Sequence, residues 1–379
     1  MKIGVDTFGC DHGRSGIGSY ILSIVKNLPK NDYEFELFGP ELDKYTYTSD
    51  IDYVSFTGID ISDTKLSEKL WHFKNLNSFI KKQKYDAVIY PAGIELLPPI
   101  FTVPSILVIQ SLLSADLGGV AKIGVKRTLK NSSGIISPTK YIKTDLAQFG
   151  VLDSNVRVIY NGIDSSLFKP INNDKDSVLI QPFAIQKPYI IYASRITHSQ
   201  KCHVELIKAF ALFKRQTGSP HRLVIAGSDG DNSEAVHNAV IQSGFSSDIL
   251  LTGYFPHESL PQLYSSADLC VFPSMIEGVG LPVIEAMACG IPVACAKAGA
   301  LPEVAGDAAI FFNPKDPEEI ARAISSLVDC DKNASTRKKV IDRGLEWVKQ
   351  YNWVSTAHQT IEYMDSLLKI TKNILKNMP

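Results

Sequence analysis

The sequence predicts an α/β protein built from two doubly wound Rossmann-like domains. Short apolar runs alternate with longer amphipathic segments: KIGVD, DAVIY, SILVI, GIIS and VRVIY in the first half, and YIIYAS, RLVIAG, LCVFP, IPVAC and AIFF in the second. Such continuous apolar runs are typical of strands buried on both faces, and helices between them indicate parallel sheets. With 379 residues, of which 45% are hydrophobic, the chain is long enough for two cores.

The predicted domains meet near a polar segment. Residues 169–187, KPINNDKDSVLIQPFAIQK, show no sustained period, so we place the interdomain linker there. The first domain is expected to cover residues 1–175 and the second 185–354. Helices are predicted at 18–28, 141–149, 204–214, 282–289 and 317–328. The last forty residues are also predicted helical, and the part from about 355 to 379 is a candidate to pack back on the first domain.

Charge and composition argue against several classes of protein. The 39 basic and 40 acidic residues give a net charge of −1, so no overall field attracts nucleic acid or an anionic membrane. The six cysteines include no CxxC pair, which is typical of reduced core thiols. The amino terminus lacks a signal-type apolar core, and the apolar stretch 98–113 is interrupted and shorter than the ~20 residues of a spanning helix. We therefore expect a cytoplasmic protein.

The most informative stretch follows the predicted strand LCVFP. A loop with Gly278 and Gly280 leads into a helix that begins near Pro282. The free N–H groups and partial positive charge of that helix start could receive hydroxyls and phosphate oxygens. Glu277 on the loop and Glu285, expected in the first helical turn, could contact one ligand there. The alternative is a dipole contact for Glu285 and a solvated loop charge for Glu277.

Two further patterns point to a phosphate site. Arg195 follows directly on a predicted strand and Lys201 precedes the next helix, so the two cations could clamp a diphosphate. The alternative is a pair of solvated surface charges. The loop GRSGIGSY has the spacing GxxGxG, in which Gly16 and Gly18 allow either close approach of a ligand or a tight turn under the helix.

The sequence gives little indication of a metal site. DxD triplets at 50–52, 174–176, 229–231 and 329–331 are about as frequent as composition alone produces, and a turn is the better interpretation of 229–231. Histidines and cysteines do not cluster with zinc spacing, and neither a Walker loop nor a GxSxG elbow is present.

Two stretches are locally basic. The segment from Lys65 to Lys84 holds six lysines against Glu68 alone, with apolar residues at helical spacing. A second basic group lies between residues 122 and 130. Basic amphipathic helices either lie on an anionic leaflet or are ordinary domain helices with a solvated face.

Taken together, the motifs resemble the retaining glycosyltransferases of family 4, which have the two-domain GT-B fold. The segment EGVGLPVIEAMACGIPV is similar to the paired-glutamate signature of that family. Its other blocks are matched, in the expected order, by GSY, VIYNGID, ASRI, LTGYF, LYSSADLCVFPS and LPEVAGDAAIFFNP. The resemblance covers nearly the whole chain. It implies two Rossmann-like domains facing each other across a cleft, with a nucleoside diphosphate sugar as donor substrate.

The resemblance also implies roles for individual residues. Arg195 and Lys201 would hold the donor diphosphate, and Glu277 would contact the transferred sugar. Glu285 would hydrogen-bond the ribose. The other implied donor contacts are the backbone of Gly278, Val279, Gly280 and Leu281, Gly16 at the diphosphate, and Gly253 with Tyr254 near the base.

One position departs from the family pattern. Where relatives commonly carry a His-Asp pair after the strand equivalent to SILVI, this chain has Gln110 and Ser111. A glutamine can hydrogen-bond a sugar hydroxyl but does not titrate near neutral pH. Gln110 is therefore a candidate sugar contact whose chemistry differs from that of the relatives.

The predicted function is metal-independent, retaining transfer of a sugar from a nucleoside diphosphate sugar, with GDP-mannose favoured, to a saccharide or lipid-linked acceptor. Surface polysaccharide or glycolipid assembly is the expected context, without a cofactor and without nucleic acid. Contact of the segment from Lys65 to Lys84 with the inner face of the membrane would suit a lipid-linked acceptor. The alternatives are a non-catalytic subunit that binds a sugar nucleotide and a sugar-nucleotide epimerase of the same fold.

Overall fold

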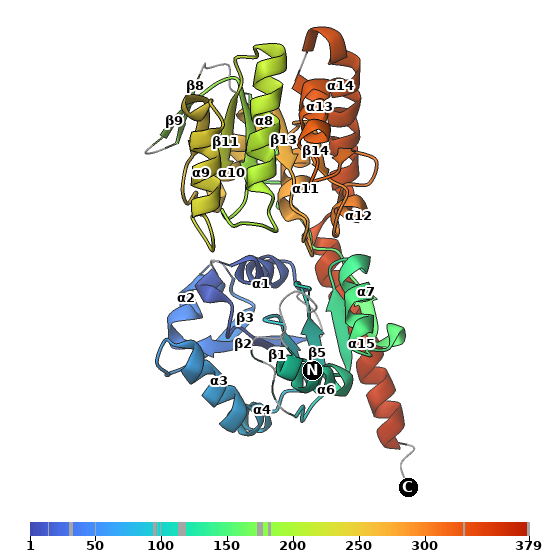
Figure 1. Cartoon of the computed structure of the whole chain (residues 1–379). Helices are drawn as coiled ribbons and strands as arrows, with labels where there is room; N and C mark the ends of the chain where they lie inside the picture. Colours follow the sequence, from blue (N-terminus) through green and yellow to red (C-terminus); the bar gives the residue numbers. More distant parts are fainter. Residues whose placement is uncertain are drawn as a thin grey trace. The chain divides into compact units, whose positions relative to one another are not determined.

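The computed structural model describes residues 1–13, 15–29, 33–49, 51–93, 96, 98, 100–112, 119–172, 177–180, 183–328 and 330–376. The chain divides into two compact units, Met1–Gly162 with Tyr351–Pro379, and Ile163–Gln350 (Figure 1). Each unit contains a parallel sheet with helices packed around it. The expected α/β class with two doubly wound Rossmann-like domains is therefore confirmed.

The first unit is built on a seven-stranded parallel sheet of order β3-β2-β1-β4-β5-β6-β7. Its strands are β1 Lys2–Asp6, β2 Glu34–Pro40, β3 Val54–Ile59, β4 Ala87–Tyr90, β5 Ser105–Val108, β6 Gly134–Ser137 and β7 Val156–Val158. Its helices are α1 Gly16–Lys26, α2 Lys44–Thr48, α3 Lys65–Lys74, α4 Leu76–Gln83, α6 Gly119–Asn131, α7 Lys140–Gln148 and α15 Trp353–Lys376. The order reverses between β1 and β4, where doubly wound sheets bind ligands.

Strand β2 was missed by the apolar-run criterion because its sequence, EFELFGP, carries two glutamates. Glu36 is nevertheless buried, at 4% exposure. It accepts a hydrogen bond from Thr57 of β3 and forms an ion pair with Lys2 of β1, so its charge is compensated by both neighbouring strands. The partners of Glu36 are distant in sequence, which is why periodicity alone did not reveal the strand.

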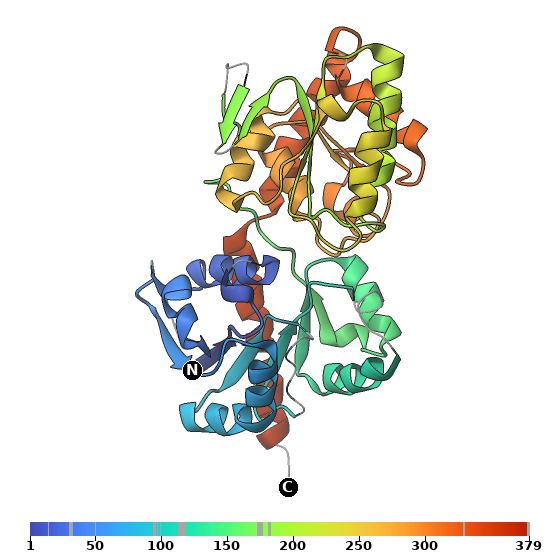
Figure 2. The same ribbon diagram turned by 60° about the vertical axis from the view of Figure 1, so that its left-hand side comes forward.

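Helix α15 belongs to the first unit although it ends the chain (Figure 2). Tyr363 and Met364 are buried in the same core as the residues of β1 and α1. The Tyr363 hydroxyl donates to the Asn155 carbonyl at 2.9 Å, and the Thr356 hydroxyl donates to the Tyr160 carbonyl at 2.8 Å. Trp347, by contrast, packs within the second unit, where its indole N–H donates to the Val304 carbonyl at 2.8 Å.

The second unit contains a six-stranded parallel sheet of order β12-β11-β10-β13-β14-β15 and a separate two-stranded sheet, β8-β9. Its strands are β8 Ser177–Ile180, β9 Phe183–Gln186, β10 Tyr189–Ala193, β11 Arg222–Ala226, β12 Ile249–Leu251, β13 Leu269–Phe272, β14 Val293–Ala296 and β15 Ile310–Phe312. Its helices are α8 His203–Thr217, α9 Glu234–Gln242, α10 Leu260–Ser266, α11 Leu281–Ala288, α12 Leu301–Ala305, α13 Pro317–Val328 and α14 Cys330–Trp347.

The predicted linker at 169–187 is wrong in its position. The chain passes from one unit to the other at Gly162 and Ile163, and part of the proposed linker forms the antiparallel pair β8-β9. Phe168 already packs in the second unit, with its ring 5.2 Å from that of His257, and the Ser265 hydroxyl donates to the Lys169 carbonyl at 3.2 Å. Residues 168 and 169 therefore contact the second unit, and composition does not show such tertiary contacts.

The cysteine side chains at positions 10, 202, 270, 289 and 295 are all buried thiols. Burial raises the pKa of the Cys202 thiol to about 11 and that of Cys289 to about 12, because an apolar environment disfavours the thiolate. These thiols therefore behave as the small apolar core residues that their sequence context predicts.

Candidate functional site

Arg195 and Glu277 lie on the two loops that leave the centre of the second sheet. β10 and β13 are neighbours, and the strand order reverses between them. Arg195 follows β10, and Glu277 lies on the loop between β13 and α11. In an open α/β sheet the carboxyl ends of the strands at such a reversal form the usual ligand crevice. The topology therefore brings the two predicted patterns to one edge.

Direct contacts tie these two loops together. The backbone N–H of Met275 donates to the Gln200 carbonyl at 2.9 Å. One residue further on, the Lys201 ammonium forms an ion pair with Glu277, and both side chains are largely shielded from solvent. The fully buried Tyr192 donates its hydroxyl to the Lys201 carbonyl at 2.9 Å, which holds the backbone of the lysine. Two residues predicted to bind the donor, Lys201 and Glu277, are thus in contact.

The glycine-bearing loop is supported from below by the turn after β14. The N–H of Ala300 donates to the Glu277 carbonyl at 3.0 Å, and a Cβ at Gly299 would lie 3.0 Å from the backbone of Glu277. Gly280, at φ +70°, turns the chain into α11. That conformation suits a residue without a Cβ. The half-buried positions 278, 279 and 281 flank this helix start. The first N–H groups of a helix have no partner within the helix and can bind an anion.

Glu285 lies further along α11 than the sequence suggested. The helix begins at Leu281, so no acidic residue falls in its first turn. The dipole interpretation of Glu285 is therefore wrong. Glu285 is buried at 7% exposure, with its Oε1 3.3 Å from Nε2 of His257. The hydrogen bond to Glu285 raises the pKa of His257 above its usual value.

The remaining predicted donor contacts differ in exposure. The Arg195 side chain is exposed, and its Nε lies 2.8 Å from where a Cβ at Gly230 would stand. Tyr254 is 73% exposed at the end of a short segment after β12. Gly253 has φ +75° and open space where a Cβ would be. Each of these residues presents an accessible surface to a ligand.

Gly16 and Gln110 lie in the first unit, whereas the other predicted site residues lie in the second. Gly16 begins α1, and nothing lies within 4 Å of a Cβ built on it. Gln110 follows β5, and its Oε1 accepts a hydrogen bond from Asn161 at 3.2 Å. Its buried Nε2 has no hydrogen-bond partner among the described residues, which leaves a donor for a ligand.

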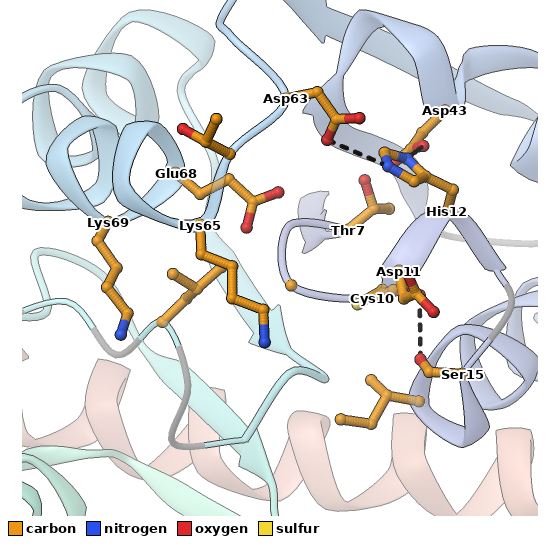
Figure 3. A pocket seen from close by; sticks show the side chains of 14 residues that line it. Thr7, Cys10, Asp11, His12, Ser15, Asp43, Asp63, Lys65, Glu68 and Lys69 are labelled. Carbon is orange, nitrogen blue, oxygen red and sulfur yellow. Dashed lines mark hydrogen bonds and ion pairs between the residues drawn. The ribbon is translucent and has the colours of Figure 1, made fainter. Parts of the chain in front are cut away.

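The first unit also holds a polar cavity that sequence reasoning missed. Its volume is about 840 Å³, and it lies where the chain leaves β1, next to the start of α3 (Figure 3). Its lining residues are Thr7, Gly9, Cys10, Asp11, His12, Ser15, Ile17, Asp43, Asp63, Thr64, Lys65, Glu68, Lys69 and Leu96.

His12 is held between two carboxylates of this cavity. Its Nδ1 lies 2.5 Å from Asp43 and its Nε2 lies 3.2 Å from Asp63. The hydrogen bond to Asp43 raises the pKa of His12. On the opposite side, burial raises the pKa of Glu68. The glycine loop and the basic segment from Lys65 to Lys84 each contribute lining residues, but these segments are distant in sequence, so neither pattern by itself indicated a cavity.

The expectations about metal sites and membrane-spanning helices can be compared only with the described residues. Within the described ranges, no group of three or more His, Cys, Asp or Glu side chains is arranged to hold a metal ion. Of the DxD triplets, those at 50–52, 174–176 and 329–331 fall wholly or partly outside these ranges. Asp229 contacts His237 at 3.0 Å, and Asp231 begins a turn. No helix among the described residues is long and apolar enough to cross a membrane.

Two models of known protein families match this chain. The family model described as glycosyl transferases group 1 matches residues 178–347, and the model described as Glycosyltransferase Family 4 matches residues 14–167. The chain belongs to this glycosyltransferase family. The group 1 match contains the ion pair of Lys201 and Glu277 and also Glu285. The family 4 match contains Gly16 and Gln110.

Two curated relatives of this glycosyltransferase are mannosyltransferases. O-antigen chain mannosyltransferase B of Escherichia coli is 36% identical over 156 residues, which are 41% of this chain and 40% of the relative. MMP alpha-(1->4)-mannosyltransferase of Mycolicibacterium hassiacum is 28% identical over 226 residues, which are 57% of this chain and 49% of the relative. The chain thus spans half or less of the length of these two relatives.

Solved structures of glycosyltransferases share the fold over nearly the whole chain. Sucrose-phosphate synthase from Thermosynechococcus elongatus has a TM-score of 0.76 at 20% identity and covers 98% of this chain and 100% of its own. Anabaena HepE in complex with UDP has a TM-score of 0.74 at 18% identity, with 96% and 99% covered. These likenesses show the GT-B fold.

Proposed function

We propose that this glycosyltransferase transfers a sugar from a nucleoside diphosphate sugar, with GDP-mannose favoured, to an acceptor hydroxyl with retention at the anomeric carbon. The observation that carries the proposal is the contact of Lys201 with Glu277 in front of the α11 amino terminus. Membership of the family and the two mannosyltransferase relatives support the reaction and the donor. Surface polysaccharide or glycolipid assembly remains the proposed context.

In the proposed reaction, cationic groups stabilise the leaving nucleoside diphosphate. When the bond between the anomeric carbon and the phosphate oxygen breaks, negative charge grows on the nucleoside diphosphate. The Lys201 ammonium, the Arg195 guanidinium and the N–H groups at the start of α11 stabilise that charge. Since these groups supply the stabilisation, we expect transfer to persist in the presence of a chelator. Glu277 holds the Lys201 ammonium in the absence of donor and contacts the sugar in its presence.

Retention follows if the acceptor oxygen attacks the face that the diphosphate leaves. A new bond then forms between the acceptor oxygen and the anomeric carbon, and the acceptor proton passes to the departing phosphate. This proposal requires no protein nucleophile. Gln110 of the first unit stays a proposed sugar contact, because its Nε2 could donate to a sugar hydroxyl.

Glu285 is proposed to bind the donor ribose. Its Oε1 faces His257, and a carboxylate can accept further hydrogen bonds from sugar hydroxyls. The exposed ring of Tyr254 is available to the base. In the first unit, the cavity around His12 offers carboxylates and lysines that can hydrogen-bond the hydroxyls of a saccharide acceptor.

Thermal unfolding with GDP, UDP, ADP, CDP and TDP in turn tests donor binding. GDP is expected to raise the unfolding midpoint, because a ligand at 100 times its Kd adds about 2.7 kcal/mol to the stability of the folded state. Glu285→Ala should remove most of that shift, whereas Glu303→Ala, on the neighbouring α12, should not. A shift by none of the five nucleotides, or an equal shift in Glu285→Ala, would contradict the proposed donor site.

Turnover of GDP-mannose by Lys201→Ala tests the assignment of charge stabilisation. We expect kcat/KM to fall by about 100-fold or more, the size typical of losing one group that binds transition-state charge. Lys208→Ala is the matched control, because Lys208 is an exposed lysine on the following helix. Wild-type kcat/KM in Lys201→Ala would sink the proposed role.

A second candidate function is a non-catalytic subunit that binds a sugar nucleotide, favoured by Gln110 at a position where relatives commonly carry histidine. That function predicts nucleotide-dependent stabilisation without turnover of donor in the presence of an acceptor extract. Turnover by the wild-type protein that falls in Gln110→Ala would exclude it. A protein that binds GDP tightly but transfers no sugar would favour it over the transferase.

A further inference from the structure

The apolar stripe expected along residues 66–80 is divided between two environments. The structure breaks the predicted helix at Asn75 into α3 and α4. In α4, the apolar side chains at positions 76 and 80 are buried in the core. In α3, Leu66, Leu70 and Phe73 are 68%, 48% and 69% exposed. Their spacing of four and three residues places them on one face of that helix.

Other residues of α3 already attach it to the unit. Trp71 stacks on Phe8, with ring centroids 4.9 Å apart, and is 8% exposed. His72 is 3% exposed, and its Nε2 lies 2.7 Å from Asp6 of β1. The exposed apolar face is therefore not needed to hold the helix in place, although leaving three large apolar side chains in water is unfavourable.

The exposed charged side chains of α3 and α4 are all lysines, while Asp60 and Asp63 are exposed in the segment that precedes α3. Lys65, Lys69 and Lys74 are exposed on α3, and Lys81 and Lys82 are exposed on α4. Glu68, the one acidic residue of the two helices, is partly buried and lines the polar cavity. The chain as a whole has a net charge of −1, so this concentration of lysine is local.

We propose that α3 docks the protein on an anionic lipid leaflet. Leu66, Leu70 and Phe73 insert at the boundary between headgroups and acyl chains, and the lysines beside them contact lipid phosphates. Long lysine side chains can keep their ammonium groups at the headgroup level while their methylenes cover apolar surface. Apolar burial and attraction to anionic lipid then act together, as peripheral membrane helices require.

Charge complementarity favours an anionic leaflet over a second copy of this chain or another protein. A second copy of this chain would bring the same lysines against one another, which is repulsive. Protein interfaces are typically rimmed by mixed polar groups, whereas the exposed charged side chains of α3 and α4 are all lysines. An anionic leaflet offers a continuous negative surface that matches such a border.

The same helix borders the cavity proposed to hold the acceptor. Lys65, Glu68 and Lys69 line it, and Figure 3 shows the Glu68 side chain directed toward Thr7 and His12, whereas Lys65 and Lys69 extend in another direction. Docking through Leu66, Leu70 and Phe73 would therefore bring that cavity close to the membrane surface. An acceptor sugar carried on a lipid would be presented where the proposed function needs it.

Co-sedimentation of the full chain with vesicles tests the docking directly. We expect binding to vesicles of phosphatidylcholine mixed with phosphatidylglycerol, little binding to phosphatidylcholine alone, and weaker binding as salt is raised. Joint substitution Leu66→Ser, Leu70→Ser and Phe73→Ser should reduce binding at least tenfold. Joint substitution Lys74→Gln, Lys81→Gln and Lys82→Gln, outside the cavity, should do the same.

Matched controls separate docking from damage to the fold. Ile241→Ser removes an equally exposed apolar side chain, 73% exposed on α9, and Lys338→Gln with Lys339→Gln removes exposed lysines of α14. Both controls should bind vesicles as the wild type does. Each patch variant should keep the wild-type unfolding midpoint and GDP-induced shift.

Three outcomes would overturn the docking proposal. The wild type could fail to bind anionic vesicles, or the α3 variant could bind them as well as the wild type does. Alternatively, analytical ultracentrifugation could show a dimer that only the α3 variant loses, without vesicle binding, which would assign the face to a second copy. Failure of the wild type to bind nucleotide would instead contradict the transferase proposal and would leave the vesicle-binding result intact.

Discussion

At the scale of single residues, buried polar side chains position the groups proposed to bind the donor. The fully buried Tyr192 donates to the carbonyl of Lys201 and also packs against His203, with ring centroids 4.7 Å apart. Neither residue has an accessible surface for a ligand, so both act through Lys201. Sequence patterns assigned Tyr192 to a strand but did not indicate that its hydroxyl supports a site.

His203 makes the second unit sensitive to acid. It is fully buried, with Nδ1 3.1 Å from the Thr197 carbonyl, and burial lowers its pKa to about 4. Because the unfolded chain then binds more protons than the folded chain between pH 6.5 and 4, stability present above pH 6.5 is lost as the pH falls. We expect a loss of about 3 kcal/mol across this window, measured by urea unfolding at several pH values.

His203→Asn should be less stable than the wild type at pH 7 but should lose less stability on acidification. His237→Asn is the control, because His237 is a half-exposed histidine of the same unit and should keep the wild-type pH dependence. If NMR showed His203 titrating near pH 6.5, the proposed origin of the acid sensitivity would be wrong.

At the scale of elements, the start of α1 gives different roles to the two glycines of the loop GRSGIGSY. Ser15 caps the helix by accepting a hydrogen bond from the Gly18 N–H at 3.1 Å. A Cβ at Gly18 would lie 2.5 Å from the Gly13 Cα, whereas one at Gly16 would meet nothing within 4 Å. Gly18 is therefore the packing glycine of the tight turn, and Gly16 keeps an open surface.

Alanine should destabilise the protein at position 18 but have little effect on stability at position 16. Gly18→Ala forces backbone against backbone and should cost about 2 kcal/mol or more, in the range of overpacked cores. Gly16→Ala should change stability by no more than about 0.5 kcal/mol, because the site is open and alanine suits a helix. Denaturant unfolding of both variants measures the difference. Equal destabilisation by the two substitutions would contradict the packing role of Gly18.

The segment 65–83 likewise shows what helical spacing predicts and what it does not. One continuous apolar stripe was expected there, and Asn75 divides it so that α4 buries its share while α3 does not. Helical spacing predicts that apolar side chains share a face. It does not predict whether that face meets a core, since the neighbouring elements come from elsewhere in the chain.

At the scale of the whole molecule, the chain leaves the first unit at Gly162 and returns to it at Tyr351. Helix α15 completes the first core, where Met364 is 1% exposed and packs with residues of the sheet and α1. The second unit, by contrast, is one uninterrupted segment. Stability of the first unit therefore depends on the last part of the sequence.

Calorimetry of Met364→Ala should show this dependence. Removing its buried side chain is expected to cost about 2–5 kcal/mol and to lower the transition of the first unit. The transition that GDP raises, assigned to the second unit, should keep its position. Ile324→Ala, at a fully buried position of α13, is the matched variant and should lower the GDP-sensitive transition instead. A uniform shift of both transitions by either variant would show that the units unfold together.

The sequence by itself determined the class of fold and the main elements that hold the proposed site residues. Parallel strands buried on both faces produce apolar runs, and a helix start marked by glycine and proline is a local pattern, so consecutive residues suffice to predict them. That is why the helix predicted at 282–289 appears as Leu281–Ala288 and that predicted at 317–328 appears unchanged. The family resemblance rests on the same local blocks.

Only the tertiary structure decided which of these pieces meet. Lys201 and Glu277 are 76 residues apart, and Glu285 and His257 are 28 apart. Each pair forms because the strand order places the two loops, or a helix and a loop, side by side. The exposed face of α3, the cavity around His12 and the position of α15 likewise depend on contacts between distant segments. Local periodicity carries no information about those contacts, because closing a long loop in the right place depends on the sheet that forms between its ends.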